Sequence, residues 1–138
     1  MAVKQISVFV ENTPGRLAEV TRLMADSGIN LRAISVADTA DFGILRIIVN
    51  DHLAAMEALE KSGFTARITD VIGVEVDDTP GGLAEVMDLF NREKVNIEYL
   101  YSSLERNVDS ALMIFKIEDV EHGLRICEQH NLKTVPGF

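Results

Sequence analysis

The sequence contains one pattern twice, and this repeat limits the chain to folds built from two copies of a unit. When the chain is shifted by 66 residues against itself, 12 of 32 aligned positions, beginning at Lys4, are identical. The runs Thr-Pro-Gly at 13–15 and Leu-Ala-Glu-Val at 17–20 both recur. A repeat of this extent predicts two domains, which we place at residues 1–69 and 70–138.

Each copy carries the same order of hydrophobic patterns. In the first copy, apolar residues alternate over 6–10, which predicts a strand with one buried face. The helical spacing of Leu17, Val20 and Met24 predicts a helix that Pro14 opens at its first position. Further patterns predict strands at 30–37 and 42–49, a helix at 53–63 and a strand at 65–69. The order βαββαβ predicts an α+β protein with two ferredoxin-like domains.

The second copy repeats this order with no linker before it. Its strands are expected at 71–76, 96–103, 110–117 and 133–135, and its helices at 82–94 and 120–130. No segment rich in Pro, Gly or Ser separates the copies, so we expect the chain to pass almost directly from strand to strand at 69–73. Such a short connection leaves little freedom, and the two copies should lie side by side.

Charge and cysteine content argue against several classes of function. The chain has 13 Lys and Arg residues against 22 Asp and Glu residues, a formal charge of -9. This balance argues against binding to nucleic acid or an anionic membrane, because Lys and Arg supply most of the affinity for phosphates. The single Cys127 excludes an intramolecular disulfide and is expected in a helix core. No apolar stretch suits a signal peptide or a membrane helix, so we expect a cytoplasmic protein.

The repeated turn between the first strand and the first helix, at 12–15 and 78–82, is the strongest candidate for a binding site. Pro14 suits the first turn of a helix, and the hydroxyl of Thr13 can cap an amide. Gly15 leaves room for a close approach to the backbone. Unpaired amides at the helix start, together with the helix dipole, favour an anionic group such as a carboxylate. An ordinary capped turn would show the same residues, so the motif alone leaves both interpretations open.

Two asparagines, Asn30 and Asn96, stand at the start of the second strand of each copy. An amide side chain there could reach a ligand that lies over the helix start. The alternative is that asparagine occurs because it tolerates a left-handed turn.

Both halves resemble ACT domains, the small regulatory modules attached to many amino-acid biosynthetic enzymes. The resemblance covers essentially the whole chain and rests on 8–15 with Leu17 and 28–31, and on 74–81 with Leu83 and 95–97. It implies domains that pair side by side into a joint antiparallel sheet of about eight strands with helices on one face. It also implies that small ligands, usually amino acids, bind between the paired domains near the first strand-helix turn.

The resemblance assigns ligand-binding residues by position. No catalytic domain accompanies the two copies in this sequence, so the implied regulation would act on another chain. In the first copy the predicted ligand-binding residues are Asn12, Thr13, Pro14, Gly15, Asn30 and Leu31, and in the second copy they are Asp78, Thr79, Pro80, Gly81, Gly82, Asn96 and Ile97.

The two copies differ in charge. The first half holds 7 basic and 8 acidic side chains, and the second half holds 6 and 14. Asp77 and Asp78 could bind an ammonium group while the helix amides bind a carboxylate, and Glu11 and Asn12 offer a weaker version. We therefore expect two sites of different affinity, although solvated surface acids also explain such a run.

The face of the sheet away from the helices is predicted to be apolar. If Val8, Val10, Leu45 and Val49 point at the helices, alternation sends a second apolar set outward. Such a face is usually covered, so we expect a homodimer through the sheet faces; the alternative is that Tyr99 and Tyr101 line a ligand pocket. The full outward set is Phe9, Ile44, Ile48, Tyr99, Tyr101, Leu112 and Ile114.

No recognised catalytic motif occurs in the sequence. The three histidines have no metal-binding spacing, and no nucleophile elbow, phosphate loop or dinucleotide fingerprint stands out. We expect no catalytic residues, no metal and no cofactor. The sequence predicts an allosteric amino-acid sensor, with a free amino acid as ligand and an enzyme of amino-acid metabolism as a further partner. The alternatives are a ligand-free regulatory or interaction subunit and, more weakly, an enzyme built on a ferredoxin-like dimer.

Overall fold

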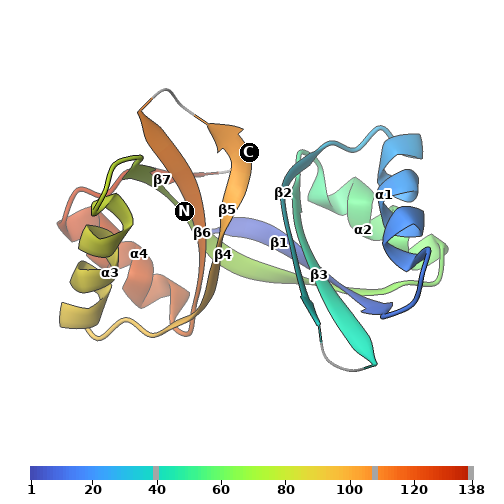
Figure 1. Cartoon of the computed structure of the whole chain (residues 1–138), viewed down its shortest axis with the longest axis horizontal. Helices are drawn as coiled ribbons and strands as arrows, with labels where there is room; N and C mark the ends of the chain where they lie inside the picture. Colours follow the sequence, from blue (N-terminus) through green and yellow to red (C-terminus); the bar gives the residue numbers. More distant parts are fainter. Residues whose placement is uncertain (39–40, 107–108, 137–138) are drawn as a thin grey trace. The chain divides into compact units, whose positions relative to one another are not determined.

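The computed structural model describes residues 1–38, 41–106 and 109–136. By compactness the chain divides into one unit of Lys4–Thr69 and a second that runs from Asp70 onward and includes Met1–Val3. In chain order the elements are β1 (Val3–Glu11), α1 (Arg16–Asp26), β2 (Leu31–Asp38), β3 (Phe42–Val49), α2 (His52–Lys61), β4 (Thr65–Asp77), α3 (Gly82–Arg92), β5 (Ile97–Arg106), β6 (Ser110–Ile117), α4 (Val120–Gln129) and β7 (Thr134–Val135) (Figure 1).

The boundary between the repeats lies inside a strand. β4 is one strand of 13 residues, where the sequence predicts one strand at 65–69 and another at 71–76. The direct passage from strand to strand is confirmed, as are the α+β class and the order βαββαβ in each repeat. Seven strands, rather than eight, occur among the described residues, because the last strand of the first repeat and the first strand of the second are continuous.

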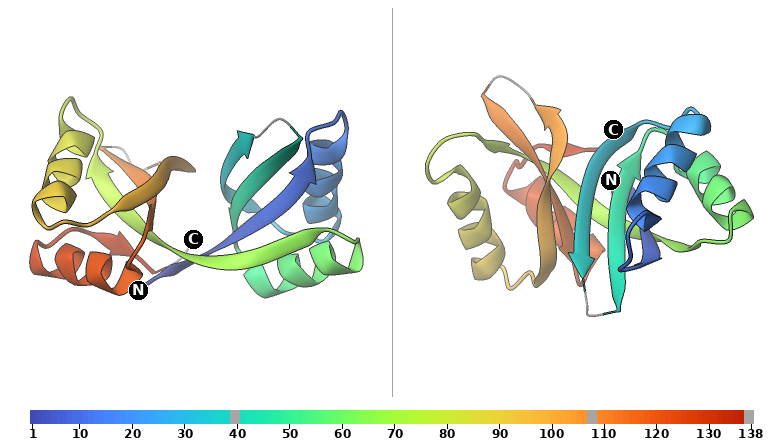
Figure 2. Two further views of the ribbon diagram at one scale, coloured as in Figure 1. Left: turned by 90° about the horizontal axis from the view of Figure 1, so that it is seen from below. Right: turned by 45° about the vertical axis from the view of Figure 1, so that its right-hand side comes forward.

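In the first unit, β3 is the central strand of an antiparallel group. β1 pairs with β3 through Val8 and Leu45, and β2 pairs with β3 through Ile34 and Ile47. β1 has a further pairing with β4. Both helices cover the same face of these strands (Figure 2). The buried core between strands and helices consists of Ile6, Val8, Val10, Val20, Met24, Ile29, Leu45, Ile47, Val49, Ala55 and Leu59, so the predicted inward set is confirmed.

The second unit repeats this packing around β6. β6 pairs antiparallel with β4 and β5, and the short β7 pairs with the other side of β4. Phe90 of α3 meets Phe115 of β6 edge to face, with ring centroids 5.4 Å apart, a favoured geometry for aromatic pairs. Lys133, just before β7, forms an ion pair with Glu75 of β4 at 2.9 Å. The ion pair and the strand pairing together hold β7 on β4.

The opposite face of the strands carries the predicted second apolar set, with uneven exposure. Ile48 and Ile114 are fully buried although neither belongs to a helix-facing core. Phe9 is exposed, and Tyr99 and Tyr101 are half-buried. The alternation predicted from the sequence therefore holds on both faces.

None of the described helices is long and apolar enough to span a membrane.

We expect the thiol of Cys127 to resist modification in the folded protein. Burial raises the pKa of this thiol to about 11, from an ordinary value of 9.0, so its reactive thiolate is scarce at neutral pH. A thiol-specific reagent should label Cys127 only after denaturant unfolds the chain, and rapid labelling of the native protein would contradict the burial.

The raised pKa of Cys127 also lowers the free energy of unfolding as the pH rises from about 9 to 11, because only the unfolded thiol ionises there. A Cys127→Ala variant should lack this part of the pH dependence.

Candidate functional site

The repeated turn has closely similar backbone hydrogen bonds in both repeats. In the first, the amide of Asn12 donates to the carbonyl of Asp41 at 3.2 Å, and the amide of Arg16 donates to Thr13 at 3.4 Å. In the second, the corresponding amides of Asp78 and Gly82 donate to Asp109 and Thr79, each at 3.0 Å. The sequence repeat is therefore a repeat of backbone structure at this site. Each turn links the end of a strand to the start of a helix.

A left-handed glycine, and not proline, opens each helix. Gly15 has φ 92° and is the N-cap of α1, and Gly81 has φ 90° and is the N-cap of α3. The prediction that Pro14 occupies the first helical position is wrong, because the glycine turns the chain once more before the helix begins at Arg16. The prediction that Thr13 caps the helix is also wrong, since α1 and α3 have no side-chain N-cap hydrogen bond.

This turn leaves amides unpaired at the start of each helix. Among the described residues, the amides of Leu17 and Ala18 have no hydrogen-bond acceptor, and the same is true of Leu83 and Ala84. In contrast, α2 begins with a carboxylate cap, in which Asp51 accepts from the amide of Ala54 at 3.0 Å. Unpaired amides and the positive end of the helix dipole favour an anion. The turns keep the donors that a carboxylate group requires.

The first helical residue distinguishes the two turns. A Cβ atom at Gly82 would overlap the backbone carbonyl oxygen of Asp77, so the start of α3 packs directly on the end of β4. The equivalent position in the first repeat is Arg16, whose side chain pairs with Glu19 at 2.6 Å and lies 4.8 Å from the ring centroid of Phe64. A Cβ at Gly15 would meet nothing within 4 Å, so the space beside this backbone is open, and a close approach there stays a prediction.

Asn30 and Asn96 lie at the far ends of their repeats from the turns. α1 has 11 residues and is therefore about 16 Å long, and the chain enters it from the turn and leaves it toward β2 (Figure 1). The amide of Asn30 donates to the side chain of Asn50 at 3.1 Å, and the side chain of Asn96 donates to Glu118 at 3.1 Å. Neither asparagine reaches a ligand over the helix start of its own repeat.

The remaining predicted residues divide between the core and the opposite face. Leu31 and Ile97 pack against the helix-facing cores, next to the two asparagines. Tyr99 and Tyr101 stack on β5 with ring centroids 6.4 Å apart. Tyr101 of β5 lies opposite Ile114 of β6, on the face away from the helices. Their role in a pocket or an interface stays a prediction.

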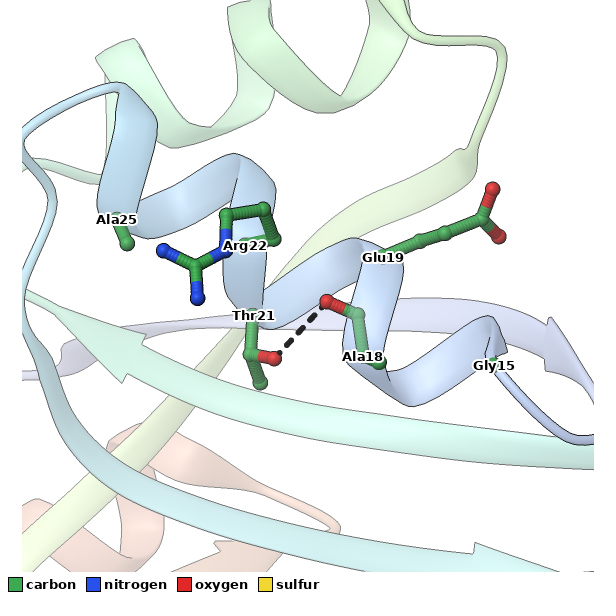
Figure 3. Close-up of a pocket in the computed structure, with 6 residues that line it drawn as sticks. All are labelled: Gly15, Ala18, Glu19, Thr21, Arg22 and Ala25. Atoms are coloured by element: carbon green, nitrogen blue, oxygen red, sulfur yellow. Dashed lines mark hydrogen bonds between the residues drawn. The ribbon is translucent and has the colours of Figure 1, made fainter.

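A surface hollow along α1 was not predicted from the sequence. It has a volume of about 580 Å³ and begins at Gly15. In Figure 3 the guanidinium group of Arg22 lies beside Thr21 and Ala25, whereas the carboxylate of Glu19 points away from them. The sequence feature that accompanies this hollow is a row of small residues, Gly15, Ala18 and Ala25, on the solvent side of the helix. Hydrophobic patterns predict only the buried side of a helix, so they do not reveal such a row.

Across residues 1–38, 41–106 and 109–136, no group of three or more His, Cys, Asp or Glu side chains could hold a metal ion.

Comparison with known proteins identifies the class of this chain. A family model described as the ACT domain pair matches residues 1–136. The structure is similar to that of protein BT0572 from Bacteroides thetaiotaomicron, with 38% sequence identity, a TM-score of 0.92, and coverage of 98% of this chain and 92% of that chain. The chain therefore belongs to the family of ACT domain pairs.

The same fold occurs in two enzyme subunits. The regulatory subunits of aspartate kinase from Thermus thermophilus, in its ligand-free form, and from Thermus flavus are each 23% identical, with TM-scores of 0.67 and 0.63. Each alignment covers 91% of this chain. It covers 91% of the Thermus thermophilus subunit and 90% of the Thermus flavus subunit. No curated protein matches the chain.

We expect Gly82→Ala to destabilise the protein by about 2 kcal/mol or more, because the added Cβ forces the start of α3 away from the end of β4. The matched control is Arg16→Ala at the equivalent position, which loses one ion pair and one ring contact and should cost about 1 kcal/mol or less. Denaturant titration of both variants measures the difference. Equal stability of the two variants would contradict the close packing at Gly82.

Proposed function

We propose that this chain is an amino-acid sensor that binds its ligand at the repeated turns and regulates an enzyme of amino-acid metabolism. The observation that carries this proposal is the left-handed glycine turn, which leaves two amides unpaired at the start of both α1 and α3. Every helix begins with amides that lack an acceptor within the helix, and in α1 and α3 no side chain caps them, so they are available to an anion in both repeats.

The family supports a regulatory role. The fold is shared with regulatory subunits of aspartate kinase, which are named as regulators of an enzyme. By analogy with these relatives, we assign no catalysis to this chain and propose that it acts on a separate enzyme. The analogy concerns the fold, so the partner enzyme here is proposed only by class.

The second turn offers partners for both charges of an amino acid. The helix amides at Leu83 and Ala84 can bind the carboxylate, and the exposed carboxylates of Asp77 and Asp78 can bind the ammonium group. Hydrogen bonds between ionised groups are about twice as strong as those between neutral groups. This combination favours a zwitterion over a simple anion.

The first turn offers a different set of charges. Glu11 and Asn12 stand where the second repeat has two aspartates, and Arg16 stands where it has Gly82. An ammonium group has one carboxylate fewer to bind there. We therefore propose that the two turns bind the same ligand with different affinities, the second more tightly.

The proposed regulation requires that ligand binding changes the surface that this chain presents to its partner enzyme. ACT-like pairing would place the ligand between domains, where it would change the orientation or rigidity of the repeats. Homodimerisation through the apolar faces that include Tyr99 and Tyr101 would extend the surface available to an enzyme. Both features are part of the proposal.

Thermal denaturation with each standard amino acid in turn tests the proposal. A ligand that binds only the folded state raises its stability, by about 2.7 kcal/mol when its concentration is a hundred times the dissociation constant. Asp78→Asn should weaken binding about tenfold, because the ammonium group loses a charged partner. Glu121→Gln, which removes one charge on α4 far along the chain, is the matched control and should bind normally.

Two results would contradict the proposal. If no amino acid raises the melting temperature or releases heat on titration, the sensor function is wrong, and the ligand-free interaction subunit becomes the better explanation. If an amino acid binds but Asp78→Asn and Glu121→Gln bind it equally well, the ligand does not use the second turn.

A further inference from the structure

A pocket on the helical face of the first unit has charges that the fold leaves unpaired. It has a volume of about 310 Å³ and lies between one side of α1 and the turn that joins α2 to β4. Arg22 and Asp26 line it, four residues apart on α1. Opposite charges at this spacing commonly pair with each other, but neither side chain has an ion pair or hydrogen bond within the described residues. One free cation and one free anion therefore lie at the same pocket.

The rest of the pocket wall is held in place. The guanidinium of Arg16 lies 4.8 Å from the ring centroid of Phe64 and pairs with Glu19 at 2.6 Å. These contacts neutralise Arg16 and Glu19 against each other and fix the long arginine side chain. The Nε atom of Arg16 is shielded from solvent and has no acceptor among the described residues. Arg16 and Glu19 therefore pair with each other, and Arg22 and Asp26 are the charged lining residues left for a ligand.

An apolar surface completes the pocket. Phe64 and Leu23 line it and also pack against the core of the first unit. Ser62 adds a hydroxyl group from the turn after α2. A ligand that meets these groups needs a negative end for Arg22, a positive end for Asp26 and an apolar part for Phe64.

The second repeat does not carry these residues. With the repeat offset of 66, the positions of Arg16, Arg22 and Asp26 hold Gly82, Asp88 and Arg92. This arrangement of charges is therefore not a by-product of the duplicated fold. The charges of Arg16, Arg22 and Asp26 are specific to the first repeat, whereas Glu19 and Leu23 recur as Glu85 and Leu89.

We propose that this pocket is a ligand site separate from the repeated turns and that it takes a small zwitterion with an apolar side chain, the class of the apolar α-amino acids. The carboxylate pairs with Arg22, whose exposed side chain borders both this pocket and the hollow along α1 and whose planar guanidinium suits a carboxylate. The ammonium group pairs with Asp26, and the side chain rests on Phe64 and Leu23. The site goes beyond the proposed function, because it uses none of the residues of the turns.

Titration calorimetry with three probes of equal skeleton tests the charge requirement. The probes are L-leucine, the acid that lacks its amine (4-methylpentanoate) and the amine that lacks its acid (3-methylbutylamine). L-leucine should bind, and each analogue should bind at least about tenfold more weakly, because it leaves one charged partner unpaired. If either analogue binds as tightly as L-leucine, or if L-leucine and L-phenylalanine both fail to bind, the proposal is overturned.

Variants locate the binding. Arg22→Gln and Asp26→Asn should each weaken binding of L-leucine about tenfold, whereas the control Arg92→Gln on α3 should bind normally. Both pocket residues are exposed on a helix surface, so the variants should fold, and circular dichroism checks this. Binding that survives in Arg22→Gln and Asp26→Asn but weakens in Asp78→Asn overturns this pocket and supports the turns. The reverse pattern supports the pocket and removes the turns as the site.

Discussion

The positive φ of Gly15 and Gly81 is the constraint on which the candidate site depends. A left-handed residue costs roughly 1–2 kcal/mol for any amino acid with a Cβ, so glycine fixes where each turn ends and each helix begins. This conformation delays the helix past the Thr-Pro pair and leaves the first amides without capping partners. The helices α2 and α4 solve the same problem with Asp51 and Asp119, whose carboxylates accept from the first turn. One kind of helix start in this protein is closed, and the other is open to an anion.

Most of the fold follows from the sequence because each element carries a clear period. The alternation around Val8 and the helical spacing of Val20 and Met24 predict both the elements and their buried faces, and the core confirms them. The predicted start of α1 at Pro14 is wrong because the preference of proline for the first helical position is only statistical. The positive φ of Gly15, which sets the true start, depends on the backbone of the whole turn. The pocket at Arg22 could not be predicted, since it needs the turn after α2 to meet one side of α1. The length of α1 already separates Asn30 from Gly15 of the same repeat, so only its reach to that helix start is excluded, and its role in ligand binding stays a prediction.

The repeats have kept their cores and changed their surfaces. Ile6 and Val8 recur as Ile72 and Val74, and all four are fully buried. At the start of the helices, a partly buried arginine in one repeat replaces a glycine in the other, and the second half carries nearly all of the net negative charge. Packing constrains interior positions in both copies, while exposed positions are free to acquire separate binding properties. Duplication of the fold therefore does not imply duplication of the ligand chemistry.

The continuity of β4 has a consequence for how this protein can be dissected. The residues that begin the second repeat extend a strand that starts in the first, and their continuation lies between β6 and β7. A cut at the repeat boundary would therefore leave two fragments, each ending in a severed strand with unpaired backbone groups. Such ends invite mispairing and aggregation. The two halves repeat one sequence pattern, but the shared strand prevents their separation by truncation, so each is best studied by substitution within the intact chain.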